Sequence, residues 1–248
     1  MEFTTTSQAV LDTGVKMLVW GESGMGKTML TATLPRPILI SAESGLLSLT
    51  EANIIRVYGA GRPDICYDIP TIKVSSIQDV EQAYLWLMNP ANNPVDANGF
   101  PQFMSIALDS LTEIAEQCLN NAKRSVKDPR QAYGELIEKM QTLVRAFRDL
   151  PGYNVYMSAK MSRNKDEFSG VTAFGPSMPG AKLGPELPYF FDEVFKLTVG
   201  KDQNTQADFR YLLTAPDMQN VCKDRSGALE QMETPHLGNV INKIKGVL

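Results

Sequence analysis

The chain has 248 residues, of which 43% are hydrophobic and 21% are charged, and its formal net charge is −4 at pH 7. This composition excludes global disorder and a surface that is positively charged throughout, so any contact with nucleic acid has to come from a local patch. The length suits one large α/β domain, and we expect a single domain over residues 1–248 with its core at about 15–230.

Six short apolar runs predict buried strands at 15–20, 37–41, 103–109, 153–159, 192–199 and 209–215. Helical patterns separate the earlier runs, at 27–33, 77–88, 111–122 and 131–149. The alternation predicts a mainly parallel central sheet flanked by helices. The last two strands are joined only by a short polar segment, 200–208, so we expect an antiparallel hairpin near the C-terminus. We expect a long loop at 160–190 and a surface excursion at 89–102.

The segment GESGMGKT, residues 21–28, lies between the first predicted strand and the first predicted helix. Its GxxxxGK[ST] spacing is that of a phosphate-binding loop, in which glycines let backbone N–H groups approach phosphate oxygens. Lys27 then supplies charge to the terminal phosphates, and the Thr28 hydroxyl binds Mg²⁺. We therefore expect a nucleoside triphosphate with Mg²⁺ to contact Gly21, Glu22, Ser23, Gly24, Met25, Gly26, Lys27, Thr28 and Met29.

Two acidic residues follow neighbouring predicted strands. Asp109 closes the run 103–109 and is the candidate second ligand of Mg²⁺; the alternative is that Asp109 or Ser110 caps the helix that follows. Glu43 lies just past the strand 37–41, where ligands of such sheets bind, and is the candidate general base for hydrolysis. The alternative for Glu43 is a solvated carboxylate near a turn.

The segments GESGMGKT, ISAESG and IALDS, in this order, resemble the core of RecA-like P-loop NTPases. In AAA+ proteins proper the catalytic glutamate usually stands beside the aspartate, and here Ser110 occupies that place. The resemblance implies an α/β RecA-like fold, ATP hydrolysis with Mg²⁺, and a homo-oligomer, either ring or filament. It departs from RecA-like recombinases at the end of the fourth strand, where they carry a Gln or His and this chain offers Ser158 and Lys160.

A late segment, VCKDRSG, resembles the finger of hexameric RecA-like proteins such as the DnaB-type helicases and KaiC. The resemblance implies that Lys223 and Arg225 act on the nucleotide of a neighbouring subunit, where a guanidinium stabilises charge on the γ-phosphate. Hydrolysis would then be slow alone and stimulated by assembly or DNA. The alternative is a solvated basic turn.

Taken together, the chain looks most like phage-encoded ATP-binding proteins of the RecA-like group, some of which act in single-strand annealing or recombination. This resemblance implies binding of single-stranded DNA, a possible single-strand binding protein as partner, and a place in the cytoplasm, that of the host if the chain is phage-encoded. No apolar run approaches the ~18 residues of a membrane span, so we expect no membrane contact. Two rival functions stay open: a ring-forming helicase-like motor, and a nucleotide-switched interaction protein without DNA activity.

In the resembled family, DNA lies against two loops, and the matching segments here are 121–132 and the predicted loop at 160–190. They carry the candidate DNA-binding cations Lys123, Arg124, Lys127, Arg130, Lys160, Arg163, Lys165 and Lys182. Phe168 and Phe174 are candidates to stack on bases. The alternative is two ordinary solvated loops, because neighbouring acidic residues dilute the charge. His236, the only histidine, is expected at the surface without a catalytic role.

Overall fold

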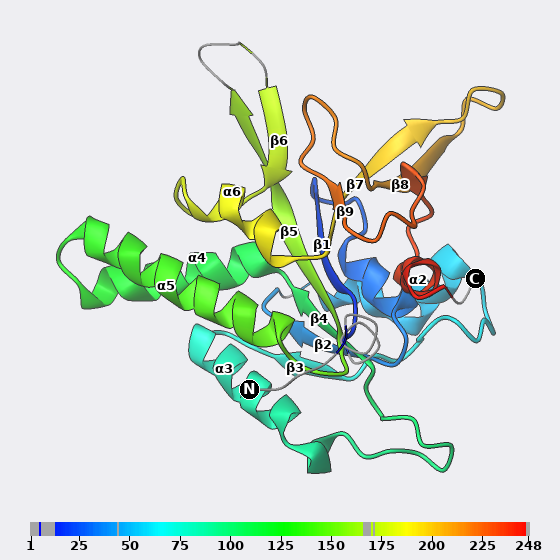
Figure 1. Cartoon of the computed structure of the whole chain (residues 1–248), viewed down its shortest axis with the longest axis horizontal. Helices are drawn as coiled ribbons and strands as arrows, with labels where there is room; N and C mark the ends of the chain where they lie inside the picture. Colours follow the sequence, from blue (N-terminus) through cyan, green and yellow to red (C-terminus); the bar gives the residue numbers. More distant parts are fainter. Residues whose placement is uncertain (1–4, 6–12, 44, 166–169, 171, 247–248) are drawn as a thin grey trace.

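The computed structural model describes residues 5, 13–43, 45–165, 170 and 172–246, and these residues build one ten-stranded sheet with helices on its two faces (Figure 1). The strands are β1 Lys16–Gly21, β2 Pro37–Ser41, β3 Thr71–Lys73, β4 Ser105–Asp109, β5 Asn154–Lys165, β6 Thr172–Pro176, β7 Glu193–Lys201, β8 Asp208–Leu213, β9 Lys223–Asp224 and β10 Met232–Glu233. The α-helices are α2 Glu51–Tyr58, α3 Ile77–Met88, α4 Leu111–Ser125, α5 Pro129–Arg148, α6 Leu183–Glu186 and α7 Leu237–Ile244. Short 3₁₀ helices are η1 Thr28–Thr33, η2 Leu46–Leu49, η3 Pro90–Asn92 and η4 Leu187–Phe190.

The strand order is β10-β8-β7-β1-β5-β4-β2-β3, and the strands from β7 to β3 run parallel. The pair β7–β8 is antiparallel, as predicted for the two late strands. The predicted α/β fold class, a mainly parallel sheet with a C-terminal antiparallel hairpin, is confirmed. Every residue of β1, β2 and β4 is buried, as expected for strands with helices on both faces.

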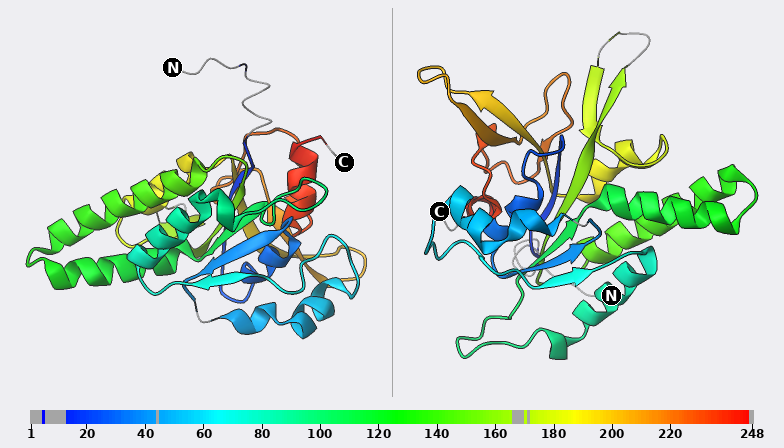
Figure 2. Two further views of the ribbon diagram at one scale, coloured as in Figure 1. Left: turned by 90° about the horizontal axis from the view of Figure 1, so that it is seen from below. Right: turned by 180° about the vertical axis from the view of Figure 1, so that it is seen from behind.

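The two faces of the sheet pack against different helices (Figure 2). Alternate residues of the central strands, such as Leu18 and Trp20, join a core with α3, α4 and α5. The residues between them, such as Met17 and Val19, join a second core with η1 and α7. This alternation follows from the two-residue period of a strand, and it leaves the carboxyl ends of β1, β2, β4 and β5 together at one edge of the sheet.

The segment 160–190 differs from the predicted loop. β5 continues past the core to Lys165 and pairs with β6 in an antiparallel arm, which projects beyond the sheet, and α6 and η4 follow (Figure 1). The outer half of β5 is partly exposed and contains no apolar run. A strand of this kind cannot be recognised from a run of apolar residues. The excursion at 89–102 is mostly exposed, as predicted.

Local signals explain several element ends. Ser110 caps α4, since its hydroxyl accepts a hydrogen bond from the Glu113 amide, and so the cap is Ser110 rather than Asp109. The predicted helix at 27–33 is a 3₁₀ helix, and it ends before Pro35, with Leu34 already extended. Among the described residues, no helix has the length and apolar character needed to cross a bilayer.

Glu193, the first residue of β7, carries a carboxyl group that is only 1% exposed. β9 runs antiparallel beside it and places Asp224 opposite Glu193. Burial raises the pKa of Glu193 to about 8, and the negative charge of Asp224 acts in the same direction. The folded protein therefore holds a proton on Glu193 at neutral pH, whereas the unfolded chain releases it near pH 4.5.

This proton predicts a pH dependence of stability. Because the folded pKa lies above the unfolded one, the contribution of Glu193 to stability falls as pH rises from about 4.5 to about 8. Glu193→Gln removes the titration, so we expect this variant to exceed wild type by about 1–3 kcal/mol at pH 9 and by much less at pH 5, in urea unfolding. Glu138→Gln, at an exposed position of α5, is the control and should change little. Equal pH profiles for wild type and Glu193→Gln would contradict the assignment.

Candidate functional site

The loop between β1 and η1 folds around the ammonium group of Lys27. Lys27 Nζ donates hydrogen bonds to the carbonyl oxygens of Gly21 and Glu22, at 2.8 Å each. Gly24 and Gly26 have φ of 78° and 103°, which favours glycine, and a Cβ added at Gly24 would meet no atom within 4 Å. The loop is thus an open cradle of backbone groups with one cation at its centre, which fits an anionic ligand.

Asp109 lies beside this loop, at the carboxyl end of β4. Its Oδ2 accepts a 2.6 Å hydrogen bond from Thr28 Oγ1, and its Oδ1 accepts one from the Ser158 hydroxyl. Burial raises the pKa of Asp109, while the hydrogen bonds from Ser158 and Thr28 act against this rise. A hydroxyl and a carboxylate are oxygen ligands of the kind that Mg²⁺ prefers, and Mg²⁺ commonly takes its other ligands from phosphates and water. The pair Thr28 and Asp109 therefore fits that ion.

Glu43 follows β2, which ends next to β4 because Ser41 is the register partner of Asp109. Glu43 Oε1 accepts a 2.5 Å hydrogen bond from Ser110 Oγ, and the amide of Ala42 donates to the Asp109 carbonyl at 2.9 Å. The structure thus brings Glu43 and Asp109 to one edge of the sheet. Sequence reasoning missed the contact between Ser110 and Glu43, because it depends on the pairing of β2 with β4.

Every second residue of β5 serves this site. Tyr156 donates a 2.7 Å hydrogen bond from its hydroxyl to the Lys27 carbonyl, Ser158 bonds Asp109, and Lys160 is the register partner of Gly21. The face of β5 that carries Tyr156 and Ser158 is therefore turned toward the loop and Asp109.

Lys160 does not lie in a loop, as the sequence predicts, but on the strand β5. Its ammonium group lies 3.2 Å from carboxylate oxygens of both Glu113 and Glu116. Burial lowers the pKa of Lys160, and the hydrogen bonds to Glu116 and Glu113 outweigh this effect and raise it. The continuation of β5 beyond the core is the physical reason for the difference.

These groups line a cavity of about 700 Å³, here called the phosphate cavity. Its walls include the loop residues, Glu43, Asp109 and Lys160, and also two arginines that no motif contains, Arg56 of α2 and Arg210 of β8. Among the predicted loop contacts, Met25 is not on its wall.

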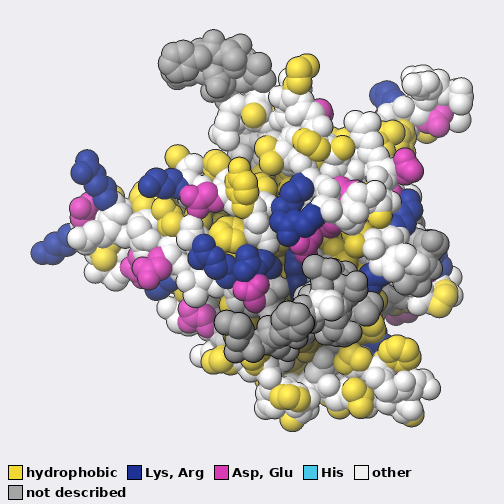
Figure 3. All heavy atoms as spheres, viewed as in Figure 1, with side chains coloured by type: hydrophobic (Ala, Val, Ile, Leu, Met, Phe, Trp, Pro, Cys, Tyr) yellow, Lys and Arg dark blue, Asp and Glu magenta, His cyan; other side chains and the backbone are white. Residues whose placement is uncertain are grey.

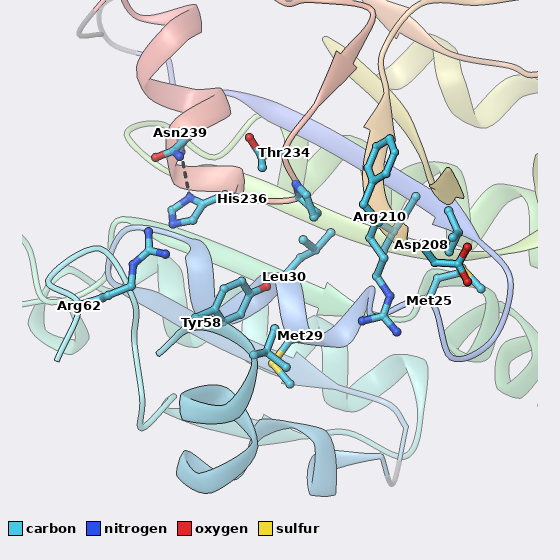
Figure 4. Close-up of a pocket in the computed structure, with 16 residues that line it drawn as sticks. Met25, Met29, Leu30, Tyr58, Arg62, Asp208, Arg210, Thr234, His236 and Asn239 are labelled. Carbon is cyan, nitrogen blue, oxygen red and sulfur yellow. Dashed lines mark hydrogen bonds between the residues drawn. The ribbon is translucent and has the colours of Figure 1, made fainter. Parts of the chain in front are cut away.

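A second cavity of about 620 Å³, here called the side cavity, adjoins the first (Figure 4). The two share Gly26, Met29, Val57 and Arg210. Apolar side chains of the loop, η1, α2 and the β7–β8 hairpin line most of the side cavity. They include Met25, Leu30, Leu197, Val199 and Phe209. The polar side chains that line it include Arg62, Asp208, Thr234, His236 and Asn239.

His236 corrects another expectation, since it is only 6% exposed. Its Nδ1 accepts a hydrogen bond from the Asn239 amide and so caps α7, and its Nε2 lies 3.1 Å from an oxygen of Asp64. Burial lowers the pKa of His236, although the charge of Asp64 opposes this. The surface position was wrong because the sequence analysis missed α7, although Leu237, Val240 and Ile241 recur at helical spacing; the packing of α7 on η1 buries the ring.

Comparison with known proteins identifies the family. Residues 13–226 match the family described as AAA domain. The chain belongs to the AAA domain family. No curated protein sequence matches this AAA domain. A solved structure, a KaiC-like protein from the hyperthermophilic archaeon Pyrococcus horikoshii OT3, shares 14% identity over 81% of this chain and 78% of that chain, with a TM-score of 0.39. A likeness at this level supports no inference about function.

The AAA domain holds its two finger candidates away from its own phosphate cavity. Arg225 Nη1 lies 2.8 Å from Asp192 Oδ1, and Lys223 Nζ donates to the Pro188 carbonyl at 2.9 Å. β9 pairs with the start of β7, whereas the loop follows the end of β1, which runs parallel to β7. Lys223 and Arg225 therefore lie toward the opposite edge of the sheet, and neither is on the cavity wall.

Most of the candidate DNA-binding cations lie on helices and strands, whereas Lys127 and Lys182 lie in short links beside helices. Lys123, Arg124, Lys127 and Arg130 surround the end of the α4–α5 helical hairpin, where dark blue side chains stand out in Figure 3. Because the two helices continue to Ser125 and from Pro129, only 126–128 separate them. The expected loop at 121–132 is thus mostly helix.

The remaining cations lie nearer to the arm. Arg163 is on β5, its guanidinium 5.9 Å from the ring centroid of Phe174 on β6. Lys182 immediately precedes α6. Lys165 ends β5, and Phe168 lies outside the described residues.

Tyr133 of α5 connects the two groups of cations. The Lys123 ammonium lies 5.6 Å from the Tyr133 ring centroid, and the same ring lies against Gly180, two residues before Lys182. Tyr133 is 37% exposed, so an exposed aromatic surface lies beside Lys123. Sequence reasoning missed Tyr133, because only the fold brings 180 to α5.

Tyr156 offers a test of how the loop is held. Tyr156→Phe removes the hydrogen bond to the Lys27 carbonyl, so we expect a loss of about 1–2 kcal/mol in stability and weaker nucleotide binding. Tyr153→Phe is the matched control, since it removes one hydrogen bond, from Asn93 Nδ2, at a site away from the loop. Urea unfolding and calorimetric nucleotide titration of both variants check this. Equal nucleotide affinities of the two variants would refute a role of Tyr156 in loop geometry.

Proposed function

We propose that this AAA domain binds and hydrolyses ATP with Mg²⁺ and binds single-stranded DNA, in phage-type recombination or strand annealing in the cytoplasm. The observation that carries the nucleotide part is the convergence of Lys27, Thr28, Asp109 and Glu43 on one cavity. The membership of the AAA domain family supports the same assignment.

The proposed chemistry distributes roles among these residues. Mg²⁺ held by Thr28 and Asp109 would draw charge from the phosphate oxygens. The Lys27 ammonium gains a charge-assisted hydrogen bond when it turns from the carbonyls of Gly21 and Glu22 to an anionic phosphate. Glu43 orients the attacking water and takes up its proton, with its other oxygen held by Ser110.

The side cavity supports a nucleoside as the rest of the ligand. It adjoins the loop, its walls are mainly apolar, and its rim offers hydrogen-bonding groups such as Thr234 and Asn239. Met25 faces this cavity and not the phosphate cavity, so the loop itself contributes to both parts of the ligand site. The preference for ATP rests on the RecA-like resemblance.

The position of the finger candidates supports action between subunits. Since Lys223 and Arg225 lie toward the other edge of the sheet and do not line the chain's own phosphate cavity, their proposed target is the phosphate cavity of another copy of the chain. A homo-oligomer, ring or filament, would supply that copy, and it would make turnover depend on assembly.

Mixing two inactive variants tests this arrangement. Arg225→Ala keeps the loop intact, and Lys27→Ala keeps the finger intact, so a mixture should form some interfaces with both parts intact. We expect each variant alone to lose at least about 100-fold in turnover, and the mixture to recover a measurable fraction. The control is a mixture of Arg225→Ala with a chain that carries both Lys27→Ala and Arg225→Ala, in which no interface has an intact finger. Turnover that stays at the level of that control would count against action between subunits.

The cations around Tyr133 support binding of single-stranded nucleic acid. A binding surface of this kind needs cations along the phosphates and aromatic faces for the bases, and Lys123 and Tyr133 supply both, with Lys182 two residues beyond Gly180 at the same ring. The net charge of the whole chain is negative, so this local gathering carries the DNA proposal.

Charge removal at the helical hairpin tests DNA binding. Changing Lys123, Arg124, Lys127 and Arg130 together to Gln should weaken binding of a labelled single strand and reduce the salt slope, log K against log salt, by about 3, since each cation contributes about 0.7. Lys73→Gln, on the far edge strand β3, is the control. Wild-type turnover should rise with single-stranded DNA. If DNA neither binds at low salt nor changes turnover, the nucleotide-switched interaction protein is favoured; strand displacement on a forked duplex favours the motor.

A further inference from the structure

Two arginines of the phosphate cavity are unexplained by the proposed chemistry. Arg56 lies in the last turn of α2, and Arg210 lies in β8, so they reach the cavity from two separate elements. Both residues are exposed, and within the described part of the chain neither guanidinium has an acidic partner or a hydrogen bond. Unpaired guanidinium groups that converge on a concave wall are available to an anion.

The other charges of the cavity show why such groups are needed. Its acidic side chains are Glu22, Glu43 and Asp109. Of its two lysines, Lys160 is already paired with two glutamates of α4, which leaves Lys27 as the cation facing the ligand. A triphosphate stays anionic with Mg²⁺ bound, and one lysine against three carboxylates attracts it only weakly. Arg56 and Arg210 raise the number of cations that face the ligand to three, which balances the three carboxylates.

Arg210 has a distinctive position, because it is on the walls of both cavities. Figure 4 shows its side chain extending from β8 toward the space between Met25 and Met29, where the two cavities meet. If the nucleoside of a ligand occupies the side cavity, the first phosphate of its tail lies where the two cavities meet, next to Arg210. Arg56 is on the wall of the phosphate cavity alone.

We propose that Arg56 and Arg210 form a clamp on the phosphate tail of the chain's own nucleotide, with Arg210 at the phosphate nearest the nucleoside and Arg56 further along the tail. This inference rests on the proposed nucleotide function and adds two positioning residues that lie outside the loop motif. Each guanidinium can bind phosphate oxygens in a bidentate manner, which gives the clamp directional preference for a polyphosphate. Because the two residues belong to α2 and to the β7–β8 hairpin, the nucleotide ties both elements to the loop.

Competition against a fluorescent ATP analogue tests the clamp in the full-length protein. Mg-ATP, Mg-ADP and AMP are titrated into wild type, Arg56→Gln, Arg210→Gln and Lys73→Gln. We expect about a tenfold loss of ATP affinity for each cavity variant. Arg56→Gln should leave AMP affinity unchanged, whereas Arg210→Gln should weaken all three ligands. Lys73→Gln, which removes an exposed charge on the edge strand β3, should match wild type.

The outcomes separate the clamp from the nucleotide function itself. If wild type binds no nucleotide, the proposed function fails and the clamp fails with it. If wild type binds ATP and Lys27→Ala does not, but Arg56→Gln and Arg210→Gln bind as wild type, only the clamp is overturned. Circular dichroism checks the fold, and the variants Arg56→Lys and Arg210→Lys, which retain the charge, should recover part of the affinity.

A readout independent of affinity is hydrogen exchange. At saturating Mg-ATP, we expect protection of 51–58 and 208–213 in wild type and reduced protection of the corresponding element in each glutamine variant. Unchanged exchange of both segments on nucleotide binding would overturn the clamp.

Discussion

The buried carboxylate of Asp109 is the interaction on which the site depends. It ends β4, and it receives hydroxyl groups from Thr28 in η1 and Ser158 in β5, while its backbone carbonyl receives the amide that follows β2. Burying a carboxylate is costly, and here the cost is offset by donors from neighbouring elements. The same contacts fix the start of η1 against the sheet edge. Loop, strand ends and acidic group are therefore positioned by one network.

The site could be predicted from sequence as far as its parts are local or lie at strand ends. The glycine and lysine spacing identified the loop, and apolar runs ending in Asp109 and before Glu43 identified two strands whose ends meet, which the structure confirms as geometry. Arg56, Arg210 and Tyr133 could not be found this way. Each lies on a segment that carries no motif. Its place beside the cavity or beside Gly180 depends on the packing of elements that are distant in the sequence.

Two local predictions were wrong for different reasons. The outer half of β5 carries no apolar run, so the sequence predicts a loop there and does not show that Lys160 lines the phosphate cavity; the proposed contact of Lys160 with DNA stays a prediction. His236 was predicted at the surface because α7, a short helix, was not recognised. In both cases hydrogen bonding and packing from distant segments decided the local structure.

The alternation along β5 has a consequence for how this sequence can vary. Tyr156 and Ser158 contact the loop and Asp109 because one residue, Met157, separates them and faces the core on the α4 side. A deletion or insertion of a single residue between them would send the following side chains to the α4 side of the sheet and bring apolar neighbours to the nucleotide. Relatives of this chain should therefore tolerate length changes in the arm beyond Lys165, but not in the six residues that precede Lys160.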